Sequence, residues 1–183
     1  MIVILSSTNR PGSNTRKVTA RVEAIYKSLG VKTQVLDLAD LPAEIISPSS
    51  YAEKPVGLKK FTDDILAADG LVVVTPEYNG GIPGILKYFI DMLPFPESFE
   101  QRPVCFVGLA AGIWGALRPV EQLQAIFGYR NAYLFPERVF MPGIGKLLDD
   151  AGQFTSPDME KRLHKQAEGF VGFVESLRGK KLR

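Results

Sequence analysis

The chain has 183 residues, of which 45% are hydrophobic and 23% are charged, and its formal net charge at pH 7 is +2. This length suits one domain with a full hydrophobic core, so we expect a single domain over residues 1–183. The balanced charge lacks the basic footprint of nucleic-acid binding. No apolar run approaches the ~20 residues that cross a bilayer. We therefore expect neither a nucleic-acid partner nor membrane insertion.

The sequence starts directly with a strand pattern, without a basic segment and cleavage site, so we expect a cytoplasmic protein. Cys105 is the only cysteine and falls in an expected core strand, which favours a buried, unreactive thiol. His164 is the only histidine and lies among Lys161, Arg162 and Lys165, so a solvated helix face is expected. This composition disfavours both histidine-based hydrolysis and a zinc site, and we expect no bound metal.

Strand and helix patterns alternate along the whole chain. Strands are expected near residues 1–6, 31–37, 70–75, 103–109 and 131–140. Helices are expected near residues 14–29, 56–68, 83–93, 115–128 and 156–177. Five such β-α units predict a three-layer α/β sandwich around a parallel sheet. Residues 40–55 and 141–157 are expected as surface connections, and the basic end from Arg178 to Arg183 as an exposed terminus.

The first strand is followed by a loop rich in hydroxyl and amide side chains, residues 6–15, at the start of a helix. Ser13 or Asn14 is a natural N-cap, and Arg10 adds a positive charge. Helix N-termini bind anions, so this loop suits a phosphate. It contains neither the G-x-G-x-x-G fingerprint nor a Walker Gly-Lys-Ser/Thr ending. Helix capping alone is the alternative explanation.

The third strand ends in the most informative segment of the chain, Pro76-Glu77-Tyr78-Asn79-Gly80-Gly81-Ile82-Pro83. Pro76 stops the strand, the glycines permit unusual backbone angles, and Pro83 suits the first turn of a helix. Loops at the carboxyl ends of buried parallel strands are typical ligand-binding loops, because their amides are exposed. The alternative is a loop composed simply of good turn residues.

The fourth strand leads into a third loop, Gly108 to Gly115, which consists mainly of small residues. Small residues let a planar ligand come close to the backbone. Loops after parallel strands open at the same edge of a doubly wound sheet. We therefore expect the three loops to form one binding site.

With these loops in place, the chain resembles the NADPH-dependent FMN reductase family, flavodoxin-like proteins that include quinone, chromate and azo-dye reductases. The resemblance runs over essentially the whole chain and is most specific at Pro76 to Gly80, followed by Pro83-Gly84 and Leu86-Lys87. It implies a flavodoxin-like sandwich whose five-stranded parallel sheet has the order 2-1-3-4-5.

The other two loops are also similar to family motifs. The first is similar to the phosphate loop G-S-x-R-x-x-S, with Ser6 in place of the glycine and Arg10 one residue late. The third is similar to S-x-G-x-x-G-G, with Ala110 in place of the serine and Ala116 in place of the second glycine.

The resemblance implies a bound FMN and assigns residues to each part of it. The residues that would hold the phosphate are Ser7, Arg10, Ser13, Asn14 and Thr15. Those that would line the flavin ring and the ribityl chain, mostly through backbone amides, are Pro76, Glu77, Tyr78, Asn79 and Gly80. Those that would border the pyrimidine edge are Ala111, Gly112 and Trp114. Alternatively, Glu77 or Tyr78 faces a partner subunit, and Trp114 is a core or interface aromatic.

The resemblance further implies an NAD(P)H-dependent oxidoreductase. A hydride would pass from NADPH or NADH through FMN to a small-molecule acceptor: a quinone, free flavin, an azo compound or a metal oxyanion. The absence of a second nucleotide fingerprint favours a ping-pong mechanism. FMN carries the chemistry, so we expect no catalytic acid or base. The alternatives are an FMN-binding electron carrier, which the balance of 22 basic and 20 acidic residues disfavours, and a redox sensor.

The helix after residue 83 is apolar nearly all round, with Ile82, Ile85, Leu86, Tyr88, Phe89, Ile90, Met92, Leu93 and then Phe95. One face can pack on the sheet, which leaves Tyr88, Phe89 or Met92 in need of cover from another chain. We therefore expect a homodimer or homotetramer with the flavin site near the interface, as the resemblance also implies. The alternative is that residues 40–55 or 141–157 cover this helix within one subunit.

Overall fold

The protein is described here by a computed structural model over residues 1–178. Five strands form one parallel sheet: β1 (Ile2–Ser6), β2 (Thr33–Asp37), β3 (Gly70–Pro76), β4 (Pro103–Ala110) and β5 (Tyr133–Pro142). Their order is β2-β1-β3-β4-β5, and every adjacent pair is parallel. The expected sheet and strand order are therefore confirmed.

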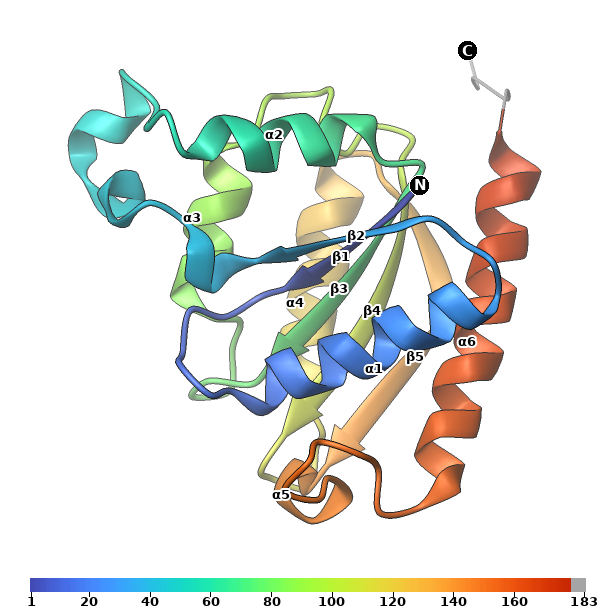
Figure 1. Ribbon diagram of the computed structural model, residues 1–183. Coiled ribbons are helices and arrows are strands. Elements are labelled where there is room, and N and C mark those ends of the chain that lie inside the picture. The colour runs from blue at the N-terminus through green and yellow to red at the C-terminus, as the bar shows by residue number, and fades with distance from the viewer. Residues whose placement is uncertain (179–183) are drawn as a thin grey trace.

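Helices cover both faces of this sheet (Figure 1). One face carries α1 (Asn14–Ser28) and α6 (Pro157–Leu177). The other carries α2 (Leu58–Ala67), α3 (Gly84–Met92) and α4 (Leu117–Tyr129). The three-layer, flavodoxin-like sandwich is thus confirmed. None of the helices over residues 1–178 is both long enough and apolar enough to cross a bilayer.

The three central strands are buried along their whole length because helices cover both of their faces. Cys105 lies in β4 and is fully buried, and burial raises the pKa of its thiol, so the reactive thiolate is disfavoured. The expectation of an unreactive core cysteine is confirmed. His164 lies on α6 beside Glu168, with its side chain partly exposed to solvent as expected.

The pairing of β4 with β5 is irregular, and a side chain of α6 compensates for it. Val104 pairs with Leu134, but Phe106 pairs with Arg138, so β5 carries extra residues at this point. Gln166 of α6 is buried there and donates from Nε2 to the carbonyl of Phe106 at 3.0 Å and to that of Glu137 at 2.9 Å. Its side-chain amide satisfies carbonyl oxygens that would otherwise be buried without a donor.

Both segments expected as plain connections contain short helical turns. Residues 38–51 contain three 3₁₀ turns, Leu38–Asp40, Ala43–Ile46 and Pro48–Tyr51. Residues 144–147 form the short helix α5 (Ile144–Leu147). Ile45 of the second 3₁₀ turn is buried in the same hydrophobic cluster as α3. These turns were missed because single buried residues such as Ile45 give no periodic signal.

The cover of α3 differs from the sequence-based expectation. Phe89 packs edge-on against Phe61 of α2, with 6.0 Å between ring centroids. Met92 is fully buried, and Nζ of Lys54 lies 3.8 Å from its sulfur. The prediction that Phe89 or Met92 needs cover from another chain is therefore wrong, since α2 and residues 40–55 cover them. Tyr88 does remain exposed.

The amino ends of the strands are held by hydrogen bonds from charged groups. The guanidinium of Arg102 donates to the carbonyls of Ser98, at 2.7 Å, and of Ala68, the residue after α2. Asp69 accepts from the amino group of Met1 and, at 2.9 Å, from Arg178. Arg178 is exposed as expected, although its guanidinium pairs with Asp69, and the rest of that predicted terminus, residues 179–183, lies outside the described residues.

Candidate functional site

A cavity of about 310 Å³ lies at the carboxyl ends of β1, β3 and β4. All three predicted loops and α5 contribute to its lining: Arg10, Pro11, Gly12, Ser13, Asn14, Thr15, Pro76, Glu77, Tyr78, Leu109, Ala110, Ala111 and Ile144. The expectation of one shared site is therefore matched by the geometry. The predicted residues outside this lining are Ser7, Asn79, Gly80, Gly112 and Trp114.

The first loop presents a helix start to the cavity. The side chain of Ser13 caps α1 by accepting from the backbone N–H of Arg16 at 3.3 Å. The other N–H groups of the first turn have no intrahelical acceptor, as at any helix start. The first turn of α1 also carries no acidic residue. The hydroxyl and amide side chains, the N–H groups and Arg10 therefore suit a phosphate.

Ser7 is placed differently from the other residues of this loop. It is fully buried, and both its N–H, at 3.1 Å, and its hydroxyl, at 2.8 Å, bond to the carbonyl of Val74. Its side chain therefore joins the end of β1 to β3, and the geometry gives no support to Ser7 as a phosphate ligand. Sequence reasoning could not detect this, because the direction of a side chain at a strand end depends on the neighbouring strand.

The second loop, after β3, is a tight turn that uses most of its own amides. Asn79 and Gly80 have φ angles of 51° and 76°. The N–H groups of Tyr78 and Gly81 each bond to the other residue's carbonyl at 3.0 Å. Two consecutive left-handed residues inside such a pair are typical of a type I′ turn. Glu77 also donates its N–H to Leu109 at 3.1 Å. The loop therefore lines the cavity with Pro76, Glu77 and Tyr78 rather than with a row of free amides.

A hydroxyl pair joins the first and second loops. The oxygen atoms of Tyr78 and Thr8 lie 2.7 Å apart, and Thr8 also accepts from the N–H of Arg10 at 3.2 Å. Thr8 is buried and was missed by the sequence-based prediction. The only available signal was its position among the hydroxyl residues of the first loop. This pair fixes the two loops relative to each other at the cavity.

Glu77 brings an unsatisfied acceptor to the cavity. Its side chain is only 14% exposed, and its Oε1 lies 3.7 Å from a guanidinium nitrogen of Arg118. Within residues 1–178, the buried Oε2 has no hydrogen-bond partner. Buried acceptors without a partner are rare and costly, so the atom suits a ligand that donates there. FMN carries ribityl hydroxyls and a ring N–H, so the cavity fits FMN in its donor and acceptor chemistry as well as at the phosphate.

The third loop, after β4, is attached at both ends to the end of β5. Gly112 accepts from the N–H of Gly143 at 3.3 Å. Gly115 has a φ of 58°, and a Cβ atom there would lie 2.8 Å from the backbone nitrogen of Pro142, so only glycine fits. Between these points Ile113 is 81% exposed and Trp114 is 54% exposed. The loop therefore presents two large apolar side chains to solvent beside the cavity.

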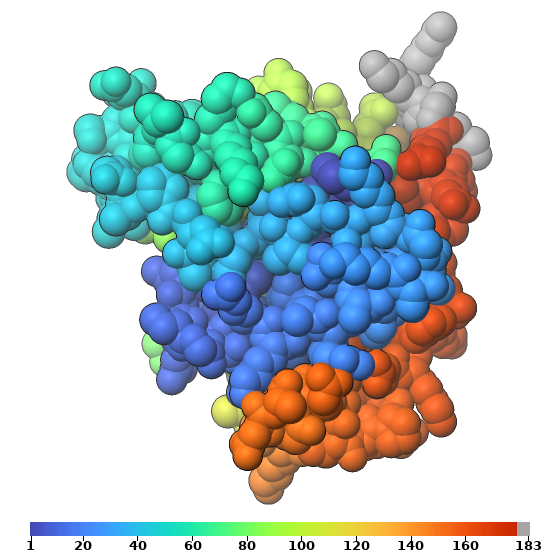
Figure 2. All heavy atoms as spheres, in the orientation of Figure 1, coloured from blue at the N-terminus to red at the C-terminus, as the bar shows by residue number. Residues whose placement is uncertain are grey.

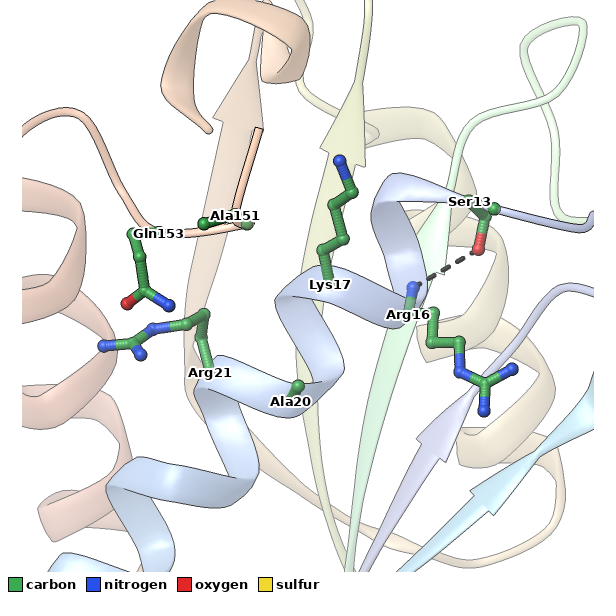
Figure 3. Close-up of a pocket in the computed structure, with 9 residues that line it drawn as sticks. Ser13, Arg16, Lys17, Ala20, Arg21, Ala151 and Gln153 are labelled. Carbon is green, nitrogen blue, oxygen red and sulfur yellow. Dashed lines mark hydrogen bonds between the residues drawn. The ribbon is translucent and has the colours of Figure 1, made fainter. Parts of the chain in front are cut away.

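A second hollow of about 340 Å³ lies on the outer side of α1 and shares Gly12 and Ser13 with the cavity. Its cationic side chains extend in different directions (Figure 3). Arg16 pairs with Asp37 at 3.5 Å, and Arg21 pairs with Glu160. Two of its cations are thus already neutralised.

The far wall of this hollow is the turn before α6. Gly152 packs on the stem of Lys17, since a Cβ added there would lie 3.4 Å from the Cβ of Lys17. Figure 2 shows this segment against the amino-terminal part of α1. The hollow therefore lies between α1 and the turn before α6. Only the first of the three loops contributes to its lining. Across residues 1–178, no three His, Cys, Asp or Glu side chains cluster closely enough to hold a metal ion.

Comparison with known proteins identifies the family of this chain. A family model described as NADPH-dependent FMN reductase matches residues 1–145. The chain belongs to this family. A quinone reductase from Pseudomonas putida is 30% identical over 160 residues, which cover 84% of this chain and 83% of the relative. An NADPH-dependent FMN reductase from Pseudomonas aeruginosa is 26% identical over 140 residues, 76% of this chain and 75% of the relative.

Solved structures show the same fold over almost the whole chain. A flavoenzyme NAD(P)H:acceptor oxidoreductase from Paracoccus denitrificans aligns with a TM-score of 0.77 at 22% identity, covering 96% of each chain. A flavodoxin from Streptococcus pneumoniae aligns with a TM-score of 0.61 at 16% identity, covering 94% of this chain and 97% of the other. At the level of the family, the resemblance, the oxidoreductase class and the use of FMN with NADPH are confirmed.

Proposed function

We propose that the protein is an NAD(P)H-dependent FMN reductase with quinone reductase activity, acting as one FMN-binding domain over residues 1–183. A hydride would pass from NADPH or NADH to FMN and from there to a quinone, free flavin, an azo compound or a metal oxyanion. The observation that carries the proposal is the single cavity at which a helix start, the signature loop and the third loop meet. The names of the relatives, FMN reductase and quinone reductase, support the same chemistry.

Each loop has a role in this proposal. Arg10, Ser13, Asn14 and Thr15 hold the phosphate at the start of α1. Pro76, Glu77 and Tyr78 line the ribityl chain and the ring, and the unpaired Oε2 of Glu77 accepts a hydrogen bond from the cofactor. Ala111 borders the ring from the third loop. FMN supplies the hydride chemistry when bound, while the protein binds and orients it.

The same geometry supports a ping-pong mechanism. Within the described residues, one cavity joins the three loops, and the sequence holds no second nucleotide fingerprint. The nicotinamide and the acceptor would therefore use the same open side of the flavin in turn. We also propose a cytoplasmic location, where NAD(P)H is available as reductant.

The decisive experiment is a flavin titration followed by an activity assay. The purified protein is expected to be yellow or to become yellow with FMN, and to oxidise NADPH or NADH when a quinone is present. FMN at a hundredfold excess over its dissociation constant stabilises the folded state by about 2.7 kcal/mol. A melting temperature that does not respond to FMN would contradict the proposal. A stable blue semiquinone on dithionite titration would instead favour an electron carrier.

We further propose that two copies pair through α3 and α4, as a homodimer or as half of a homotetramer. A groove of about 590 Å³ runs between these helices, and its apolar lining includes Ile90, Leu93, Phe95, Ile126 and Tyr129. Phe95 and Tyr129 are 64% and 80% exposed, and a twofold pairing is the commonest way to bury such a surface. Light scattering at micromolar concentration with FMN bound tests this, and a mass of 20.1 kDa would contradict it.

A further inference from the structure

The exposure of Trp114 is imposed by the backbone around it. The third loop is fixed by the contacts of Gly112 and Gly115 with the end of β5. The carbonyl of Trp114 itself accepts from the N–H of Leu117 at 3.0 Å, at the start of α4. The indole is therefore held outward by an ordered turn. Trp114 and the adjacent Ile113 thus expose two large apolar side chains beside the cavity, and clustered exposed apolar residues are the kind of surface that marks a contact site.

Arg118 connects this indole to the cavity. Its guanidinium carbon lies 5.8 Å from the centroid of the Trp114 ring, within cation–π range. The same guanidinium lies 3.7 Å from Oε1 of Glu77, which lines the cavity. Its stem passes the second loop, since a Cβ on Gly80 would lie 3.9 Å from Cδ of Arg118. Glu77, Arg118 and Trp114 thus form a chain of contacts from the inside of the cavity to its outer rim.

We infer that Trp114 is the surface on which planar aromatic acceptors of the quinone class stack, and that Arg118, held by Glu77, is the residue that positions the indole. This inference rests on the proposed function. Electron-poor planar rings stack favourably on an indole. A guanidinium beside the ring also suits the partially negative carbonyl oxygens of a quinone. Compact inorganic acceptors such as ferricyanide offer no planar ring and do not need this surface.

The chain provides its own probe, because Trp114 is its only tryptophan. In the FMN-loaded protein, titration with 2-methyl-1,4-naphthoquinone is expected to quench tryptophan emission to saturation. Arg118→Ala is expected to raise the apparent dissociation constant roughly two- to fivefold, the effect of an exposed cation–π contact. The ratio of kcat/KM for the quinone to kcat/KM for ferricyanide should fall by the same factor. Arg118→Lys keeps the charge but loses the planar group, and should lie in between.

Arg138→Ala is the matched control. Arg138 lies 5.7 Å from the ring centroid of Phe140 on β5 and donates to Gln124 at 3.0 Å, but it does not line the cavity. Arg138→Ala should change neither the quenching of tryptophan emission by the quinone nor the ratio of kcat/KM for the quinone to kcat/KM for ferricyanide.

Three results would overturn the inference: quenching that never saturates, equal losses for quinone and ferricyanide, or an emission that depends on protein concentration without quinone. The last would show that a second copy covers Trp114. Failure of the proposed function looks different, since FMN would then not bind or ferricyanide would not be reduced by NAD(P)H.

Discussion

The two edges of the sheet differ in how some of their charged side chains are bonded. At the amino edge, the donors of Arg102 reach the carbonyls of Ser98 and Ala68, and also those of Leu66 at 3.4 Å and Glu97 at 3.2 Å. At the carboxyl edge, Glu77 keeps a buried oxygen without a partner within residues 1–178, and Trp114 stands in solvent.

The pairing of the carboxylates also differs between the two edges. The amino group of Met1 and then Arg178 lower the pKa of Asp69 at the amino edge through their hydrogen bonds, so its carboxylate is stabilised. At the carboxyl edge, Glu77 keeps a carboxylate oxygen without a partner within residues 1–178, beside the cavity. Left-handed backbone does not distinguish the edges, because Gln101 and Asn131 at the amino edge have positive φ angles, as Asn79 and Ala116 have at the carboxyl edge. A buried acceptor without a partner is a cost that a fold tolerates where a ligand binds, so the pairing of the carboxylates distinguishes the edge that carries the cavity.

The largest expected effect comes from removing the guanidinium of Arg102 at the amino edge. Arg102→Ala leaves several carbonyl groups without their charged donor, and we expect the free energy of unfolding to fall by about 3 kcal/mol. The dissociation constant of FMN should not change, because Arg102 lies at the opposite edge from the cavity. Urea unfolding and a flavin titration measure the two quantities. Lys59→Ala is the control, since its 2.6 Å pair with Asp63 is exposed and contributes little. Weaker FMN binding in Arg102→Ala would show that the two edges are coupled.

The next effect comes from the strained third loop. Gly115→Ala places a Cβ 2.8 Å from the nitrogen of Pro142 at a φ of 58°, and we expect a loss of about 2 kcal/mol in unfolding free energy together with weaker FMN binding. Gly128→Ala is the matched control, because no atom lies within 4 Å of its added Cβ and it sits in α4. The free energy of unfolding of Gly128→Ala should rise by up to about 1 kcal/mol. Equal losses in both variants would mean that the strain at Gly115 is not special.

The phosphate loop should discriminate between two flavins. The double variant with Ser13→Ala and Asn14→Ala should weaken FMN binding about tenfold, because hydrogen bonds to charged groups are the strong ones. Riboflavin, which lacks the phosphate, should lose much less affinity. Flavin fluorescence gives both dissociation constants. Equal losses for the two flavins would show that the loop only caps α1.

The smallest effect concerns the contact between the first two loops. Tyr78→Phe removes the hydroxyl that lies 2.7 Å from the buried Thr8 oxygen, and we expect a cost of about 1 kcal/mol in unfolding free energy. Tyr51→Phe serves as control, because the side chain of Tyr51 is 62% exposed at the surface. Thermal unfolding of the two variants should differ. Identical curves would indicate that Arg10 alone satisfies Thr8.

The sequence predicted the sheet and the three loops because their signals are local. The central strands β1, β3 and β4 are buried on both faces, so they read as short apolar runs that end in turn residues. The order of the strands came from the family resemblance and is confirmed. The segment from Pro76 to Tyr78 lines the cavity as predicted.

The parts that could not be predicted depend on contacts between distant residues. Ser7 bonds across to Val74, Thr8 pairs with Tyr78, and Ile144 reaches the cavity from α5. Local sequence does not encode these directions. The cover of Met92 by residues 40–55 was only the alternative to cover by another chain, because the composition of that segment indicated an irregular loop and did not show which surface it packs on.

The contact of α6 with the sheet has a consequence for synthesis on the ribosome. Phe170 and Val174 of α6 pack closely against the start of β3. A Cβ added to Gly70 there would lie 3.1 Å from the Phe170 ring and 2.8 Å from a methyl carbon of Val174. Gln166 bonds to Phe106, sixty residues earlier in the chain. The nascent chain therefore completes all five strands while α1 is the only one of the two helices that covers this face of its sheet. Folding of this face must wait for the 21 residues of α6, from Pro157 to Leu177. A stalled chain that lacks α6 would expose the apolar side chains that α6 covers and become a target for chaperones and proteases.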